Sequence, residues 1–246
     1  MNALQGFFYR YGWDTRCRNL CPARLLQAAL PASTRRSQPT LLDVGSGELG
    51  LSAFLRGLSV VGSDLAPSQP RNGRFRFVRS TATALPFRDG AFPAVSCIDV
   101  LEHLAPARRA EAITECIRVA SSLVLFAFPD GPTAHACDQA FQEACRLRSR
   151  QVPAWVEEHL RHEYPASDGV AEQVRQAAAR LGRRARLTAS ACEPLAICRL
   201  VRAAASRSTL LYALCNLWFG LCAPLLRPPR PGDGYRTVLL AELTPS

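Results

Sequence analysis

Short apolar runs alternate with helix-like segments through the first half of this chain. Runs rich in branched and aromatic residues predict strands at residues 41–44, 59–64, 75–80, 94–100 and 123–128. Helical patterns fill two of the gaps between them, at residues 48–57 and 107–119. Because strands that alternate with helices form a parallel sheet covered on both faces, we predict a doubly wound α/β fold.

The second half is mostly helical in pattern. One helical stretch is predicted at residues 133–182, with breaks at Pro153 and Pro165. Two further strands are predicted at residues 186–191 and 235–243.

The segment before the first strand is also helical in pattern. We therefore divide the chain into an N-terminal helical lid, residues 1–36, and one domain, residues 37–246, with helical insertions at residues 133–182 and 194–226. The aromatic residues Tyr9, Tyr11 and Trp13 either close over a ligand or fix the first helix to the core.

Composition limits the class of protein. With 246 residues, 48% of them hydrophobic and 20% charged, the chain is too apolar for a disordered protein. Its net charge of +10, carried by arginine without any lysine, favours anionic partners but identifies none. No stacking module accompanies the arginines, so we expect no nucleic-acid partner.

Ten cysteines are scattered along the chain. They form no C-x-x-C pair and no zinc-finger spacing, so we predict no metal site. Several lie in apolar runs, which favours buried free thiols in a reducing compartment. The N-terminus lacks the pattern of a signal peptide, and we expect a cytoplasmic protein.

A glycine-rich turn follows the first predicted strand. It contains Gly45, Gly47 and Gly50, and an acidic residue, Asp64, ends the next strand. Strand, glycine turn and helix bring bare backbone close to a ligand, and Asp64 is placed to accept hydrogen bonds from both hydroxyls of a ribose. Nicotinamide and flavin sites share this pattern, so the turn alone does not identify the ligand.

Carboxylates around the turn help to distinguish which kind of cofactor it binds. Asp43 precedes the turn, Glu48 lies inside it and Asp99 ends the fourth predicted strand. Acidic groups disfavour the pyrophosphate of a dinucleotide. They favour a ligand that bears an ammonium and a sulfonium, as S-adenosylmethionine does.

The residues between the third and fifth predicted strands make this prediction specific. Leu85-Pro86-Phe87, followed by a buried strand and by Leu101-Glu102-His103, resembles the middle of small class I S-adenosylmethionine-dependent methyltransferases. The resemblance runs from about residue 38 to residue 130. It implies a mostly parallel seven-stranded, Rossmann-like sheet with a reversed final strand, and S-adenosyl-L-methionine as the cofactor.

The resemblance also implies the cofactor-binding residues. The glycine turn would line the methionine side, Asp64 would hold the ribose, the residues after the third strand would flank the adenine, and Asp99 would lie near the methyl group. The candidates are Asp43, Gly45, Ser46, Gly47, Gly50, Asp64, Leu65, Thr81, Ala82, Leu85 and Asp99. The family often has Asp where this chain has Thr81, and commonly where it has Pro93.

Two residues are candidates for proton transfer at a methyl acceptor. His103 follows Asp99 by four residues and is a candidate general base, although this histidine recurs across the family irrespective of the acceptor. Asp130 follows the fifth strand and faces the acceptor in the predicted topology, but it is equally typical of a turn.

Residues 208–226 carry no charge across 19 positions, which is close to the minimum length of a membrane span. A span would separate the final strand from its sheet. We therefore favour a buried helix or a pocket wall, with a dimer contact or a peripheral membrane patch as the alternatives.

These patterns lead to one principal hypothesis. We expect an S-adenosylmethionine-dependent methyltransferase that acts on a small-molecule or a lipid- or glycan-linked acceptor, with oxygen favoured as the acceptor atom. The alternatives are a non-catalytic, cofactor-binding assembly subunit of the same fold and an NAD-type oxidoreductase. The oxidoreductase is disfavoured because the chain has no lysine for a Tyr-x-x-x-Lys pair.

Overall fold

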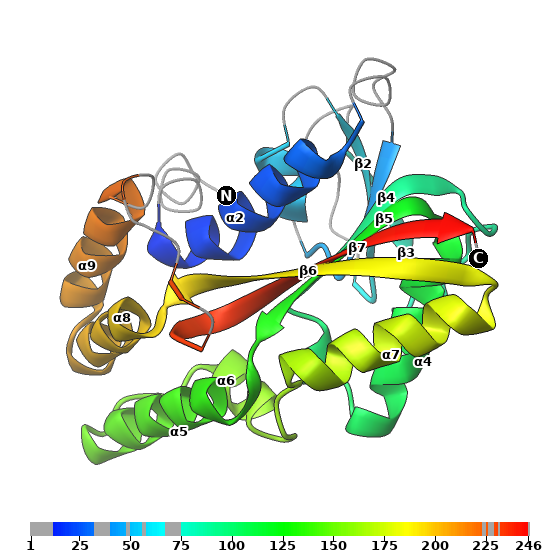
Figure 1. Cartoon of the computed structure of the whole chain (residues 1–246). Helices are drawn as coiled ribbons and strands as arrows, with labels where there is room; N and C mark the ends of the chain where they lie inside the picture. Colours follow the sequence, from blue (N-terminus) through cyan, green and yellow to red (C-terminus); the bar gives the residue numbers. More distant parts are fainter. Residues whose placement is uncertain are drawn as a thin grey trace.

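The chain folds around a seven-stranded mixed sheet with helices on both faces (Figure 1). The computed structural model describes residues 12–31, 40–47, 50–55, 58–66, 75–222, 225, 229–230 and 232–245. The strands are β1 (Thr40–Val44), β2 (Ser59–Asp64), β3 (Phe75–Arg79), β4 (Phe92–Ile98), β5 (Ala120–Pro129), β6 (Arg183–Pro194) and β7 (Gly234–Pro245).

The order of the strands places the glycine turn at the centre of the sheet. The order is β3-β2-β1-β4-β5-β7-β6, and β1 to β5 pair in parallel. β7 is antiparallel to both of its neighbours, β5 and β6. The predicted seven-stranded sheet with a reversed final strand is therefore confirmed.

Helices within the described residues cover the sheet and extend one end of it. They are α2 (Trp13–Ala29), α4 (Pro106–Val119), α5 (Gly131–Leu147), α6 (Ala154–His159), α7 (Ser167–Arg180), α8 (Leu195–Arg207) and α9 (Thr209–Cys222), with single 3-10 turns at η1 (Gly50–Ala53) and η2 (Leu101–His103).

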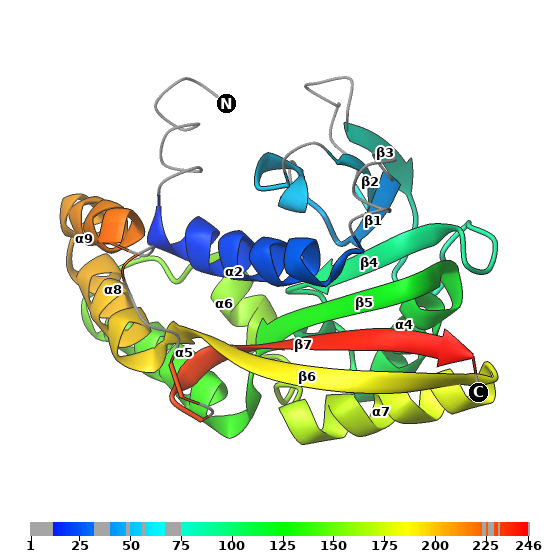
Figure 2. The same ribbon diagram turned by 45° about the horizontal axis from the view of Figure 1, so that its top comes forward.

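The sheet separates two hydrophobic clusters. α2 lies on one face, and α4 and α7 lie on the other (Figure 2). Alternate residues of β5 divide between these faces, because successive side chains of a strand point in opposite directions. Leu125 and Ala127 pack in the cluster of α2, whereas Val124 and Phe126 pack in the cluster of α4 and α7.

Proline breaks divide the long helical stretch as predicted. α5 ends before Pro153, α6 begins directly after it, and α7 begins two residues after Pro165. The predicted helix at residues 48–57 differs, because its described part forms only the short η1.

The first described helix is fixed to the core by Trp13. This side chain is 1% exposed and meets Phe219 of α9 edge to face, with ring centroids 6.0 Å apart. Trp13 therefore anchors α2 and does not close over a ligand. Tyr9, Tyr11 and the predicted helical residues 1–11 and 32–36 lie outside the described residues.

Residues 208–226 are predicted to form a buried helix or a pocket wall. Burial is wrong for most of α9, whereas Thr209 and Tyr212 line a cavity. Leu210, Leu214 and Trp218 are 69%, 58% and 66% exposed. The reason is position: α9 packs on α8 and α2 at the margin of the molecule, so only one side of it is covered (Figure 1). None of the helices that the structure describes has the length and apolar character needed to cross a bilayer.

The expectation of free thiols is wrong for one pair of cysteines. A disulfide joins Cys21 of α2 to Cys192 of β6, across a sequence separation of 171 residues. The fold brings these two positions together, which their spacing in the sequence does not indicate. The other eight cysteines are free, and most of them are buried.

Candidate active site

The glycine turn between β1 and η1 has left-handed backbone at Gly45, Gly47 and Gly50, and the first two serve different purposes. Gly45 has a φ of +70°, and a Cβ there would lie 2.2 Å from Cγ2 of Val100. Gly47 has a φ of +55°, but no atom lies within 4 Å of its Cβ position. Gly45 is thus required by packing, whereas Gly47 leaves open space above the turn.

Asp43 holds the turn from below. It is 2% exposed, its Oδ2 accepts a hydrogen bond from the backbone of Leu51 at 2.9 Å, and its Oδ1 accepts one from Oγ of Ser96 at 2.7 Å. Burial raises its pKa. A Cβ on Gly50 would lie 2.0 Å from Asp43 Oδ2. Asp43 and Gly50 thus organise the turn from within the protein, and their predicted place on the methionine side stays a prediction.

Ser46 and Asp64 fit a nucleoside ligand better. Ser46 is 6% exposed, and its Oγ has no hydrogen-bond partner among the described residues, so it is free to bond to a ligand group. Asp64 Oδ2 accepts a hydrogen bond from the backbone of Gly47 at 2.9 Å, and Oδ1 accepts one from Ala66 at 3.3 Å. Lone pairs remain on both carboxylate oxygens for the hydroxyls of a ribose.

The candidate adenine residues divide into exposed and buried positions. Leu65 is 66% exposed beside Asp64. Thr81 is exposed and bonds locally, because its Oγ1 accepts a hydrogen bond from the backbone of Thr83 at 3.0 Å. Ala82 is half-buried. Leu85 is 4% exposed in the core cluster of α4, so the prediction that it flanks the adenine is corrected.

Asp99 ends β4 in a strained conformation and is held by two arginines. Its φ is +51°. Arg236 donates to its two carboxylate oxygens, from Nε at 2.9 Å and from Nη2 at 2.8 Å, and Nε of Arg18 lies 3.1 Å from Oδ2. Burial opposes ionisation of Asp99, but the two guanidinium charges outweigh it and lower its pKa. The carboxylate is therefore ionised and already compensated.

These contacts correct the electrostatic argument drawn from the sequence. Asp43 faces into the protein and Asp99 is paired with Arg236 and Arg18, while Glu48 lies outside the described residues. A ring of free carboxylates does not surround the turn in the part of the chain that the structure describes. The ion pair between Asp99 and Arg236 could not be predicted from local sequence patterns, because the two residues are 137 positions apart.

A cavity of about 580 Å³ opens beside Asp99. Its walls come from α2, α5, α6, α8, α9 and the adjoining ends of β6 and β7. The side chains include charged, imidazole and aromatic groups: Asp14, Arg18, Asp99, His103, Trp155, His159, Glu193, Arg202, Tyr212, Tyr235 and Arg236. Apart from Asp99 and His103, the sequence analysis identified none of them, because no local pattern links helices so far apart.

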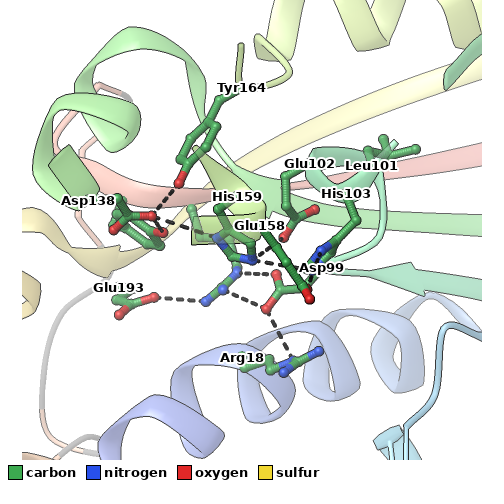
Figure 3. Close-up of polar contacts among 12 residues, drawn as sticks. Arg18, Asp99, Leu101, Glu102, His103, Asp138, Glu158, His159, Tyr164 and Glu193 are labelled. Atoms are coloured by element: carbon green, nitrogen blue, oxygen red, sulfur yellow. Dashed lines mark hydrogen bonds and ion pairs between the residues drawn. The ribbon is translucent and has the colours of Figure 1, made fainter. Parts of the chain in front are cut away.

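His103 lies at the edge of this cavity in a cluster of imidazoles and carboxylates (Figure 3). Its Nε2 is 3.2 Å from Nε2 of His159, and its Nδ1 is 3.6 Å from a carboxylate oxygen of Glu158. Burial and the neighbouring His159 lower the pKa of His103. Both ring nitrogens face protein groups, so the role of His103 as a direct general base stays a prediction.

A buried carboxylate, Asp138, lies behind His159. Its Oδ2 accepts hydrogen bonds from the hydroxyls of Tyr164 and Tyr235, and its Oδ1 is 2.7 Å from Nη1 of Arg202. Nδ1 of His159 is 3.7 Å from Asp138 Oδ2. Burial opposes its ionisation, but its hydrogen bonds and Arg202 outweigh this and lower its pKa. Asp138 therefore presents a negative charge to the ring of His159.

Asp130 has a structural role. Its Oδ1 accepts a hydrogen bond from the backbone of Ser167 at 2.8 Å, at the first residue of α7, and its Oδ2 accepts one from Oγ1 of Thr237 at 2.5 Å. It is not among the residues that line the cavity. Asp130 therefore satisfies an otherwise unpaired N–H at a helix start, and its candidate catalytic role stays a prediction.

A family model described as a methyltransferase domain matches residues 42–128, which hold the glycine turn, Asp64 and Asp99. The fold and the strand order agree with this match. The chain carries a class I S-adenosylmethionine-dependent methyltransferase domain. S-adenosylmethionine is the cofactor of this domain. That Ser46, Gly47 and Asp64 hold it stays a prediction.

Known methyltransferases resemble this domain over different lengths. A demethylmenaquinone methyltransferase of Thermus thermophilus is 32% identical over 138 residues, which are 50% of this chain and 58% of that protein. The chain thus matches little more than half the length of this curated relative.

Solved methyltransferases share the fold at low sequence identity. A 1,6-didemethyltoxoflavin-N1-methyltransferase of Burkholderia thailandensis is 14% identical, with a TM-score of 0.50, over 99% of this chain and 88% of that one. A phospholethanolamine N-methyltransferase 2 of Haemonchus contortus is 14% identical, with a TM-score of 0.55, over 92% of this chain and 53% of that one. Both were crystallised with S-adenosylhomocysteine.

Proposed function

We propose that this protein transfers the methyl group of S-adenosylmethionine to an oxygen atom of a small molecule held in the cavity beside Asp99. One observation carries the proposal: Asp99 ends the strand next to the glycine turn and also lines the cavity, so the two compartments meet at this residue. A methyl donor on the turn and an acceptor in the cavity would therefore lie in contact.

The walls of the cavity support a planar acceptor that carries a polar group. Trp155, Tyr212 and Tyr235 offer aromatic surface, and the half-exposed Arg18 offers a cation at the mouth. The relative from Thermus thermophilus is named for a small-molecule acceptor, a demethylmenaquinone. A cavity of about 580 Å³ is within the range of small-molecule sites.

The protein's contribution to the reaction is alignment and exclusion of water. Bound S-adenosylmethionine supplies the methyl group together with its own leaving group. The enclosing helices would position the acceptor oxygen for in-line attack on that methyl group and keep water away from it. The ion pairs of Asp99 with Arg236 and Arg18 fix the floor of the cavity, so the two compartments keep one relative geometry.

Binding and transfer measurements test this proposal in two stages. Calorimetry with the purified chain should show binding of S-adenosylmethionine and no binding of NAD. Transfer of a labelled methyl group should then be measured with matched phenol and aniline acceptors, and we expect label on the phenol. Binding of the cofactor without transfer to either acceptor, or to any fraction of a cell extract, would support a non-catalytic subunit. Label on the aniline alone would contradict the choice of oxygen.

A further inference from the structure

Glu102 is a fully buried carboxylate of η2. It is 0% exposed, and among the described residues neither of its carboxylate oxygens has a hydrogen bond. The nearest basic atom in an ion-pair contact is Nε2 of His159, 4.0 Å from Oε1. A buried carboxylate keeps its charge only beside a cation and otherwise takes up a proton, which a bound metal ion would displace.

Two imidazole nitrogens face each other next to this carboxylate (Figure 3). Nε2 of His103 and Nε2 of His159 are 3.2 Å apart. Two nitrogens bound to one tetrahedral zinc ion at about 2.0–2.1 Å would be separated by about 3.3 Å. The observed spacing is therefore that of two ligands of one metal ion.

The opposite nitrogens of both rings face carboxylates. Nδ1 of His103 is 3.6 Å from Glu158, and Nδ1 of His159 is 3.7 Å from Asp138. Carboxylates at this position draw the ring proton to Nδ1 and leave the lone pair on Nε2, as they do for metal-bound histidines. Two facing lone pairs repel each other unless a proton or a cation lies between them.

The alternative to a metal ion is one proton shared by the two imidazoles, with a protonated Glu102 beside them. One proton between the imidazoles would make an ordinary hydrogen bond, but both oxygens of Glu102 would still lack a partner. Ligand atoms of Glu102, His103 and His159 all lie within 4.8 Å of one another, so one ion can reach all three.

The charges around the cluster leave room for a cation. Arg236 is already paired with Asp99 and Glu193, and Arg202 is paired with Asp138. Among the described residues, no arginine lies within ion-pair distance of Glu102. A divalent ion would thus be the cation nearest to Glu102 and would take the place of the proton that the buried group otherwise holds.

We propose that Glu102, His103 and His159 form a binding site for one divalent transition-metal ion, with zinc the best match to two imidazoles and one carboxylate. Three protein ligands leave a coordination position free. His103 and His159 both line the cavity, so this position faces the acceptor.

The site deepens the proposed function, on which its role in methyl transfer rests. A hydroxyl oxygen bound at the free position would lose its proton to water more readily, because the ion stabilises the oxyanion. That oxyanion then forms a bond to the methyl carbon while the bond from sulfur to carbon breaks and its electron pair stays on sulfur. His103 would act as a ligand in this arrangement and not as the base.

Zinc binding by the chelator-treated full chain tests the site directly. Competition calorimetry should give one zinc ion per chain, and cobalt in its place should show the visible absorption of a four-coordinate ion. His159→Gln and Glu102→Gln should each weaken zinc binding by more than about 100-fold, since loss of an outer-shell partner alone costs about 10- to 100-fold. His135→Gln is the matched control, because His135 packs on Tyr164 outside the cluster.

The outcomes separate the two proposals. The metal site would be overturned if the folded wild type does not bind zinc, or if the wild type and His159→Gln bind it with equal affinity. Full methyl transfer in the presence of a chelator would also contradict a role of the metal in the reaction. One zinc ion per chain with weakened binding in both variants would support the site even if no acceptor is methylated. Binding of S-adenosylmethionine is measured separately, as a check that each variant keeps its fold.

Discussion

Arg236 of β7 and Asp99 at the end of β4 form a two-point ion pair that is closed to solvent. The two residues are 137 positions apart, and each side chain is 7% exposed. A second carboxylate, that of Glu193, lies 2.7 Å from Nη1 of the same guanidinium. One arginine from the reversed final strand therefore compensates two buried acids beside the cavity.

Removal of this arginine should destabilise the protein strongly. In Arg236→Met, Asp99 and Glu193 lose their shared cation, and we expect the free energy of unfolding to fall by about 3–5 kcal/mol. Urea titrations followed by circular dichroism measure the loss. Arg186→Met is the control, because the Arg186 side chain is 78% exposed and its ion pair with Glu242 should contribute less than about 1 kcal/mol. Equal losses in the two variants would show that the buried ion pair contributes no more to the free energy of unfolding than the exposed one.

Gly45 and Gly47 should respond differently to the same substitution. Both have left-handed backbone, which costs alanine about 1 kcal/mol. Gly45→Ala also places a Cβ 2.2 Å from Cγ2 of Val100, so it should destabilise the protein more than Gly47→Ala does. Thermal melts of both variants, and of Gly45→Ala combined with Val100→Ala, give the comparison. Failure of the second substitution to recover stability would contradict the packing role of Gly45.

Asp64→Ala should weaken binding of S-adenosylmethionine by about 2–4 kcal/mol, because two charge-assisted hydrogen bonds to the ribose are lost. Calorimetry measures the affinity. Asp64 also accepts the backbone N–H of Gly47, so Asp64→Asn, which keeps one acceptor oxygen, should have an intermediate affinity. Asp89→Ala serves as a control at a carboxylate that is 78% exposed and paired with Arg118. Unchanged affinity in Asp64→Ala would remove Asp64 from the cofactor site.

Glu193 should make stability depend on pH near neutrality. Burial raises its pKa to about 7 even though Arg236 is its partner. A raised pKa means that the folded state holds the proton more firmly, so the stabilisation is present below pH 4.5 and is lost as the pH rises through 7. The glutamine of Glu193→Gln does not titrate. The free energy of unfolding of this variant minus that of the wild type should therefore rise from pH 5 to pH 8, by about 3 kcal/mol at most. Urea unfolding at both pH values measures this difference, and a constant difference would contradict the assignment. Glu111→Gln, at a 53% exposed position, should show no such change.

The exposed face of α9 should bind anionic membranes. Leu210, Leu214, Trp218 and Leu221 are each more than half exposed, and residues 194–232 contain arginines but no acidic residue. Co-sedimentation with phosphatidylglycerol vesicles should fall when Leu214 and Trp218 are replaced by serine, because apolar insertion and arginine attraction act together. Leu147→Ser, at a 76% exposed position on α5, is the control. A dimer that dissociates in the serine variant, without vesicle binding by the wild type, would assign this face to a second copy of the chain.

Local pattern determined most of the secondary structure of this protein. The run Ser59–Asp64 is β2 with both predicted bounds, and Pro153 and Pro165 separate helices as expected. These features depend on side-chain periodicity and on the backbone limits of proline, which act between neighbours in the sequence. The glycine turn and Asp64 could be predicted from the sequence for the same reason, because they lie in one turn and in the next strand along the chain.

The tertiary structure alone decided what the carboxylates do. Asp43 and Asp99 look alike in the sequence, yet one is hydrogen-bonded below the turn and the other is paired with an arginine of the last strand. The pairing of His103 with His159 and the isolation of Glu102 likewise depend on where α6 packs. Charge compensation and burial arise from contacts between distant segments, and a pattern of neighbouring residues carries no information about such contacts.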